Sequence, residues 1–170
     1  MMYRAKDERR TETQLTLFST SAGFGYAFED HHLAKFGRPI GLDDFSGNIE
    51  DVLNRPLSNQ PGQKFQYGTS MDWVGILIER ATGLDLEGYF QKHIFKPLGI
   101  KHISFSPSTE DKLKLAHFHQ RDESGEVTEI DHLYRRPLIR SEKSMSRRYC
   151  AGGHGCFGQP REFLSQCPNE

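Results

Sequence analysis

Two consecutive helical patterns constrain the fold of this chain more than any other feature of its sequence. The first spans Met71–Ala81, with Ser70 as its expected N-cap and Gly83 at the position of a helix-terminating glycine. The second spans Leu86–Phe95 and begins at Asp85, a residue type that caps helices. Because the link between them is short, the two segments are predicted to form a helical hairpin.

The first of these helices is predicted to bury a wide apolar face. Asp72 stands in its first turn, where a negative charge favours the helix dipole. The apolar residues recur at helical spacing, at Trp73, Val74, Leu77, Ile78 and Ala81.

Shorter helices are expected on both sides of this hairpin. Asn48 is expected to cap a short helix that ends before Pro56. Ser108 with Asp111 is expected to cap another. Pro160 is expected to stand in the first turn of a final helical segment.

The remaining segments are predicted to be strands and loops. Two short strands are expected at Ala116–Gln120 and Glu126–Ile130, joined by a turn that contains Gly125. The region Glu29–Asp44 is expected to be mostly loop.

Material for a hydrophobic core is scarce. Leu, Ile, Val and Phe make up 39 of the 170 residues, only 3 of them valines, and the mean hydropathy is −0.67. Buried parallel sheets are rich in β-branched residues, so a large α/β enzyme with its own sheet is not expected. We expect a helix-rich α+β chain, with residues 1–14 as a charged N-terminal tail and 15–170 as a partial domain.

Charge and cysteine content exclude several classes of protein. The formal net charge is −1, whereas nucleic-acid-binding proteins are typically basic. No stretch approaches the roughly 18 consecutive apolar residues of a membrane span. The charged N-terminus lacks the apolar core of a secretory signal, so we expect a cytoplasmic location. The cysteines, Cys150, Cys156 and Cys167, match neither a disulfide framework nor a zinc-binding pattern.

The histidines and the glycine-rich segment are weak signals of function when taken alone. His117 and His119 share a face of a predicted strand, but no third metal ligand is evident, so no metal is expected. The segment AGGHGCFG (151–158) lacks the Lys-Ser/Thr ending of a phosphate loop, and no cofactor is expected. His154 within it either lies near a ligand or packs within the loop. The basic run 135–148 is interpreted as a solvated loop.

A combination of motifs around the helical hairpin is more specific. PGQKFQY (61–67) places a tyrosine at a turn directly before the first helix, which ends in ERATG (79–83). YFQKHIFKPLGI (89–100) follows. Together with FSTSAGFGYAF (18–28) and AGGHGCFG, these motifs resemble the serine β-lactamase-like family of class C β-lactamases, esterases and transesterases. The resemblance covers residues 15–165 and has the character of fungal esterases and lovastatin-type acyltransferases.

The resemblance implies the middle, helical lobe of the β-lactamase/transpeptidase-like fold, truncated at both ends and without most of its antiparallel sheet. In this family the serine and lysine of an S-x-x-K motif act with a tyrosine that serves as general base and acid, and a strand with K-T-G or H-x-G flanks the acyl group. The sequence has Tyr67 at the tyrosine position and Thr69 where class C enzymes have asparagine, but contains none of those three motifs. Tyr67 is therefore the catalytic candidate, and Trp73 and His154 are the substrate-binding candidates.

Three hypotheses about function stay open. The first is a family member that is inactive alone because it lacks the Ser-Lys pair, in a family whose substrates are small-molecule esters, amides or acyl thioesters. The second is an esterase or acyltransferase completed by another chain or by an unusual nucleophile, for which Ser70, Ser21 and Cys156 are candidates. The third is a non-catalytic binding or assembly module, because a lobe without its sheet leaves apolar surface uncovered for self-association.

Overall fold

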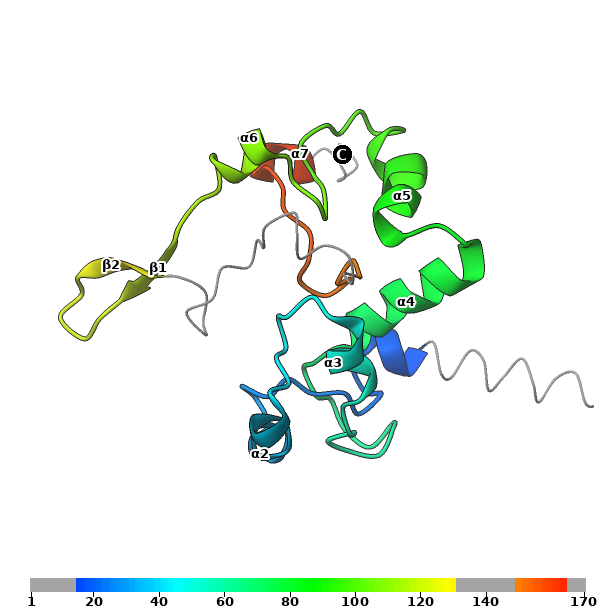
Figure 1. Cartoon of the computed structure of the whole chain (residues 1–170), viewed down its shortest axis with the longest axis vertical. Coiled ribbons are helices and arrows are strands. Elements are labelled where there is room, and N and C mark those ends of the chain that lie inside the picture. Colours follow the sequence, from blue (N-terminus) through cyan, green and yellow to red (C-terminus); the bar gives the residue numbers. More distant parts are fainter. Residues whose placement is uncertain (1–14, 131–148, 165–170) are drawn as a thin grey trace, which may run out of the picture.

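The computed structural model of the chain describes residues 15–130 and 149–164 (Figure 1). The predicted tail 1–14 and basic run 135–148 lie outside the described residues, as does Cys167. In the described part, helices dominate and the one sheet is a two-stranded antiparallel pair. The helix-rich α+β composition expected from the sequence is therefore present there.

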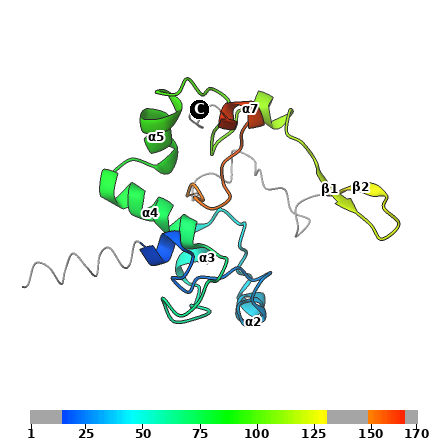
Figure 2. The same ribbon diagram turned by 180° about the vertical axis from the view of Figure 1, so that it is seen from behind.

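Helix α4 (Ser70–Thr82) connects two groups of elements (Figure 1). One group holds α2 (His31–Gly37) and α3 (Ile49–Leu53), and the other holds α5 (Leu86–Phe90), α6 (Thr109–Lys112) and α7 (Pro160–Leu164). Figure 2 shows the same two groups from behind. The segment that begins at Tyr149 runs between them and contacts both, as described below.

Helix α4 confirms the first predicted helix but corrects its cap. It begins one residue earlier than predicted, so the N-cap position belongs to Thr69, whose side chain makes no capping hydrogen bond. Ser70 is helical and fully buried. The other end is as predicted, because Gly83 has a φ of 71° and donates its N–H to Glu79 O.

The buried face of α4 differs from the predicted apolar face. Gly75 and Ile76 are buried, whereas Leu77 is 46% exposed and Ala81 is also exposed. A β-carbon on Gly75 would lie 3.0 Å from a Leu86 side-chain atom and 3.6 Å from the Gly152 backbone. The side of α4 that carries Gly75 is buried because Leu86 and Gly152 approach it closely. A hydrophobic pattern within the helix does not identify such a side.

The second predicted helix is confirmed over its whole length. Asp85 caps it by accepting a hydrogen bond from Gly88 N (2.8 Å), and α5 passes directly into a π-helical turn, η2 (Gln91–Phe95). Helices α4 and α5 contact each other across the short link. Figure 1 shows them at an angle to each other, so an antiparallel hairpin stays a prediction.

The prediction of a loop over Glu29–Asp44 is wrong. Helix α2 and the 3₁₀-helix η1 (Arg38–Ile40) occupy the middle of this region. Asp30 caps α2 by accepting hydrogen bonds from the backbone N–H groups of His32 and Leu33. Leu33 is buried, so the helix is held by packing as well as by its cap.

The other short helices agree with their predicted caps. Asn48 Oδ1 accepts from Glu50 N (3.2 Å) at the start of α3. Ser108 Oγ accepts from Asp111 N (3.1 Å) at the start of α6. Helix α7 starts at Pro160, as expected.

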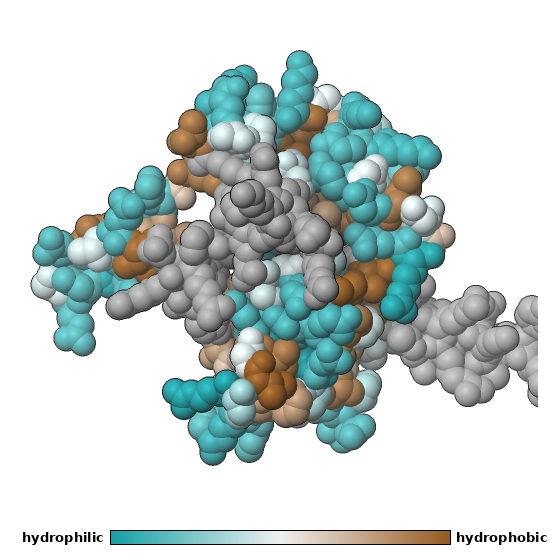
Figure 3. Space-filling model, in the orientation of Figure 1, coloured by the Kyte–Doolittle hydropathy of each residue, from teal (hydrophilic) through white to brown (hydrophobic). Residues whose placement is uncertain are grey.

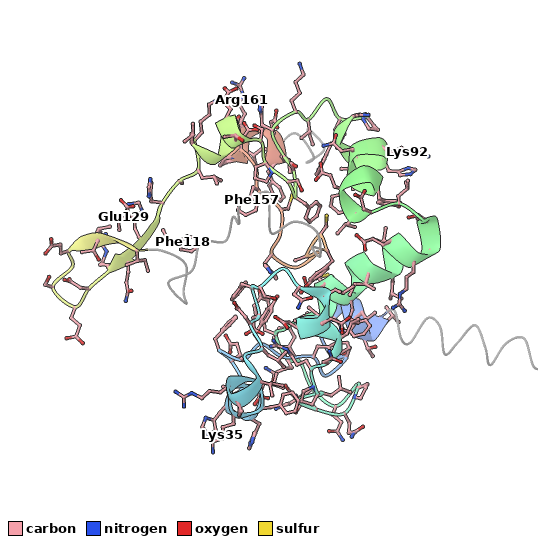
Figure 4. All side chains as sticks on the ribbon, viewed as in Figure 1. Lys35, Lys92, Phe118, Glu129, Phe157 and Arg161 are labelled. Carbon is pink, nitrogen blue, oxygen red and sulfur yellow. The ribbon has the colours of Figure 1, made fainter. Side chains whose placement is uncertain are left out.

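The predicted hairpin forms with slightly shifted bounds and projects from the rest of the molecule (Figures 1 and 2). Strands β1 (Phe118–Arg121) and β2 (Val127–Ile130) pair antiparallel, with Phe118 opposite Ile130. Figure 4 shows Phe118 and Glu129 on this arm, away from the helices. His117 lies just before β1 and not within the predicted strand, but its Nδ1 is 2.5 Å from Glu129 Oε1. Because Glu129 is the cross-strand partner of His119, both histidines lie on the Glu129 side of the hairpin.

A small apolar core joins η2 to the segment that follows it. Its members are Phe95, Ile100 and Ile103, with Phe90 and Ile94 packed on them. Ser104 and Phe157 exchange two backbone hydrogen bonds of 2.9 Å, which attach the glycine-rich segment to this core (Figure 4). A mostly apolar cavity of about 590 Å³ lies beside it, bordered by η2 and α7.

Apolar and polar patches alternate on the molecular face of Figure 3. In the described segments, no helix combines the length and the apolar character that a membrane crossing requires.

Candidate active site

The turn that carries Tyr67 is fixed against the aromatic segment near the N-terminus. Gln66 N donates to Thr20 O at 2.9 Å. A β-carbon on Gly68 would lie 2.4 Å from Phe24 O, so only glycine allows this close approach. The backbone is therefore held on both sides of Tyr67.

Tyr67 combines an accessible side chain with a buried support. Its side chain is 52% exposed, whereas Thr69 and Ser70, which follow it, are 1% and 0% exposed. Its ring meets the buried ring of Tyr26 edge to face, with centroids 5.4 Å apart. A general acid or base must come within hydrogen-bond distance of its substrate, and the exposed phenol of Tyr67 is accessible for such contact.

Trp73, one of the two predicted substrate-binding residues, lies within the packing of the same region. Its ring stacks on Phe24, with centroids 5.3 Å apart. Its Nε1 is buried and has no hydrogen-bond acceptor among the described residues. A role of Trp73 in substrate binding stays a prediction.

His154, the other predicted substrate-binding residue, lies against α4. Its ring meets Phe45 edge to face at 4.8 Å. Its Nδ1 lies 3.8 Å from Asp72 Oδ1, and the side chain is 18% exposed. The structure thus brings His154 next to a buried carboxylate, and its contact with a substrate stays a prediction.

Asp72 is the organising residue that the sequence analysis missed. Its position in the first turn of α4 is as predicted, but its side chain is fully buried. Asp72 Oδ1 accepts hydrogen bonds from Gly153 N (3.2 Å) and Tyr149 Oη (3.3 Å). The sequence signal was limited to an acidic residue in a first helical turn, which more often marks a solvated helix end.

Burial perturbs the ionisation of this cluster. Removal from water raises the pKa of Asp72, against the opposing influence of the His154 charge and of the hydrogen bond from Gly153 N. Burial also raises the pKa values of Tyr26 and Tyr149, and the neighbouring Asp72 charge adds to the rise in both. Both tyrosines are therefore hydroxyl donors at neutral pH.

A buried ion pair supports the cluster from the side of α3. The Arg55 guanidinium donates to the Asp44 carboxylate, and their side chains are 4% and 0% exposed. Asp44 also accepts from Ala27 N at 2.9 Å, next to Tyr26 in sequence. No motif in the sequence indicated this pair.

The three alternative nucleophiles lie in settings that do not activate them. Ser70 Oγ is buried and has no hydrogen-bond partner within the described part of the chain. Ser21 Oγ shares a hydrogen bond of 2.8 Å with Ser19 Oγ. Desolvation raises the pKa of the Cys156 thiol to about 11, although the residue as a whole is exposed.

No metal-binding cluster of three or more His, Cys, Asp or Glu residues occurs in residues 15–130 and 149–164. The histidines singled out in the sequence instead face carboxylates, His117 at Glu129 and His154 at Asp72.

Comparison with known proteins identifies a family to which this chain is similar. The sequence profile of the Beta-lactamase family matches residues 8–163. The chain is 30% identical over 167 residues to monacolin J acid methylbutanoyltransferase of Aspergillus terreus, covering 95% of this chain and 38% of that protein. It is 36% identical over 107 residues to lovastatin esterase of Penicillium rubens, covering 62% of this chain and 27% of that protein.

A solved structure has a similar fold over most of this chain. A mutant of simvastatin synthase from Aspergillus terreus superimposes with a TM-score of 0.70 at 31% identity, covering 89% of this chain and 34% of that one. The chain therefore spans little more than a third of the relatives that it matches along most of its own length. The resemblance to esterases and lovastatin-type acyltransferases found in the sequence is confirmed.

Proposed function

The chain belongs to the beta-lactamase family, and on this basis we propose that it is the part of an acyltransferase or esterase that contributes the proton-transferring tyrosine, Tyr67. The substrate class is a small-molecule ester, amide or acyl thioester. Two relatives support this class, one named as a methylbutanoyltransferase and the other as an esterase. We further propose that the described residues correspond to the helical lobe of the family fold.

The observation that carries the proposal is the exposed phenol of Tyr67, directly before the buried residues 68–70. A phenol has an ordinary pKa of about 10 and is a weak base at neutral pH unless a cation stabilises the phenolate. By family resemblance, that cation is the lysine of an S-x-x-K motif, which this sequence does not contain. We therefore propose that Tyr67 acts together with a serine and a lysine outside this chain.

A second part of the proposal is that these 170 residues alone do not turn over esters. Ser70 is buried, and the raised pKa of Cys156, about 11, keeps its thiol protonated near neutral pH. The Ser21 hydroxyl shares its hydrogen bond with another serine rather than with a general base.

The test has two arms. In the first, the purified chain is treated with a fluorophosphonate probe and its intact mass is measured; we expect no adduct. An adduct that maps to one serine and disappears after heat denaturation would overturn the proposed dependence on an outside nucleophile.

In the second arm, this chain replaces the matching part of the Aspergillus terreus methylbutanoyltransferase. Tyr67→Phe in the chimera should lower kcat for ester cleavage by about 10²–10⁴-fold, the usual range for loss of general acid–base catalysis. Tyr89→Phe is the matched control, because Tyr89 lies on α5 and packs on His93. Equal turnover in Tyr67→Phe and Tyr89→Phe would refute the role of Tyr67.

A non-catalytic assembly role is the second candidate, because large apolar side chains are exposed on several elements. Leu113 is 85%, Phe65 69% and Leu164 65% exposed. Light scattering at two protein concentrations tests this role. A molecular mass that rises with concentration supports self-association through exposed apolar side chains, and a constant monomer mass contradicts it.

A further inference from the structure

We propose that Asp72 is a positioning residue for Tyr67: its buried carboxylate holds the segment 149–154 on the first turn of α4 and, through Tyr26, sets the orientation of the Tyr67 ring. This inference rests on the proposed function of Tyr67. Asp72 itself is buried beneath the turn and acts through its neighbours.

The first step is the attachment of the glycine-rich segment to α4. A β-carbon on Gly152 would lie 2.5 Å from Met71 O, so the two backbones are in direct contact. Asp72 Oδ1 accepts from Gly153 N at 3.2 Å and from Tyr149 Oη at 3.3 Å. One carboxylate oxygen therefore binds this segment at two points four residues apart in sequence, where it passes the start of α4 (Figure 1).

The second step leads from Asp72 to Tyr26. A β-carbon on Gly153 would lie 2.9 Å from Asp72 Oδ2 and 3.1 Å from Tyr26 Oη, so both oxygens border the same small space. Charge on Asp72 also raises the Tyr26 pKa, consistent with their proximity. Tyr26 is 3% exposed and has little freedom to move away.

The third step leads from Tyr26 to Tyr67. The two rings meet edge to face at 5.4 Å and an interplanar angle of 64°. Tyr26 also stacks on Phe28 and Phe45, with ring centroids 5.0 and 6.0 Å away. A displaced Tyr26 would therefore change the surface on which the exposed Tyr67 ring rests.

The charge of Asp72 is balanced by donors from three segments. Tyr26 faces it from the aromatic segment, Tyr149 and His154 from the glycine-rich segment, and Arg55 acts on both tyrosines from the end of α3. Hydrogen bonds accepted by Oδ1 can equally be accepted by an amide oxygen. Asparagine should therefore preserve the position of Tyr67, and alanine should not.

The experiment uses the whole chain labelled with 3-fluorotyrosine and ¹⁹F NMR. The sequence contains 6 tyrosines, and Tyr67→Phe assigns the Tyr67 resonance. We expect Asp72→Ala to move the Tyr67 resonance by more than its linewidth and Asp72→Asn to restore it. Glu79→Ala is the matched control, since Glu79 is a carboxylate near the other end of the same helix and accepts from Leu86 N. It should leave the Tyr67 resonance unchanged.

Tyr149→Phe provides a second variant in case Asp72→Ala does not fold. It removes one hydroxyl that donates to Asp72 and should shift the Tyr67 resonance in the same direction by a smaller amount. A Tyr67 resonance unchanged in every folded variant of Asp72 and Tyr149 overturns the inference. So does an equal shift in Glu79→Ala, because that outcome indicates general destabilisation.

This result is separate from the test of the proposed function, because the NMR measurement needs no turnover. If Asp72→Ala moves Tyr67 but Tyr67→Phe leaves the chimera fully active, the proposed function fails and the structural link stands. If Tyr67→Phe abolishes turnover but Asp72→Ala leaves the resonance in place, the proposed function stands and the positioning role fails.

Discussion

Removal of Asp44 is expected to destabilise the chain strongly. The Asp44 carboxylate and Arg55 guanidinium form a pair with almost no exposure to solvent. Asp44→Ala leaves the Arg55 charge inside the protein without this carboxylate, and breaking a buried pair in this way costs about 3–5 kcal/mol. Since Arg55 Nε still donates to Asp51 O (3.4 Å), we expect the lower end of this range, about 3 kcal/mol.

Urea unfolding measures this loss, and the chain has a convenient reporter. Trp73 is the only tryptophan in the sequence and stacks on Phe24, so unfolding changes its surroundings. With a typical slope of about 1–3 kcal/mol per molar urea, a loss of about 3 kcal/mol lowers the midpoint by about 1–3 M.

Two controls separate burial of the pair from the simple loss of an ion pair. Glu110→Ala breaks the exposed pair between Glu110 and Lys114, 2.5 Å apart, and should cost far less than Asp44→Ala, because exposed ion pairs contribute little to stability. The double variant Asp44→Leu/Arg55→Leu should recover much of the loss, because apolar replacement of a buried pair is often neutral. If Asp44→Ala costs no more than Glu110→Ala, the reasoning from burial is refuted.

Three further predictions concern ionisation and capping. Burial raises the Asp72 pKa above its ordinary value of 3.8, so the stability that Asp72 contributes is complete below pH 3.8 and is lost as the pH rises through the raised pKa. Asp72→Asn should therefore become more stable relative to wild type as the pH rises through this window. Urea titrations at several pH values measure the difference, and a difference that does not change with pH would contradict the prediction. Asp85→Ala should lower the free energy of unfolding by about 1 kcal/mol, because it removes the cap of α5. Ser70→Ala should leave it nearly unchanged, because Ser70 makes no capping hydrogen bond. Equal losses of stability in thermal melts of the two variants would contradict the assigned caps. Cys150, whose pKa burial raises to about 11, should react with iodoacetamide at pH 8 more than tenfold slower than a free cysteine peptide, whose thiol has an ordinary pKa of about 8.5, as measured by intact mass.

Features of the fold that depend on neighbouring residues were predictable from the sequence. Asn48, Asp85 and Ser108 each accept a hydrogen bond from a backbone N–H group two or three residues later, so the cap and the helix are encoded within one turn. The hairpin of β1 and β2 is likewise local, with a turn that contains Gly125. The same logic applied at Asp30 would have identified α2, whose cap is of the same kind.

Features that depend on distant segments were not predictable in this way. The buried side of α4 follows from the approach of Leu86 and Gly152 to Gly75, and no periodicity in residues 70–82 encodes those partners. The same holds for Asp44 and Asp72, which a residue-by-residue hydropathy scale places at the surface. Each is buried because donors arrive from another segment, Arg55 in one case and Tyr149 with Gly153 in the other.

The candidate site depends on both local sequence features and contacts between distant segments. Tyr67 was identified by a motif, because the turn before a helix and the glycine that follows it are local requirements. Its support was not identified, because Tyr26 and Asp72 are 46 residues apart in sequence and meet only in the folded chain, where both border Gly153. A motif therefore identifies the tyrosine for which we propose a proton-transfer role, whereas the residues packed beneath it are found only from contacts between distant segments. Asp72 is the residue at which this distinction can be measured, since asparagine keeps its shape and alanine does not.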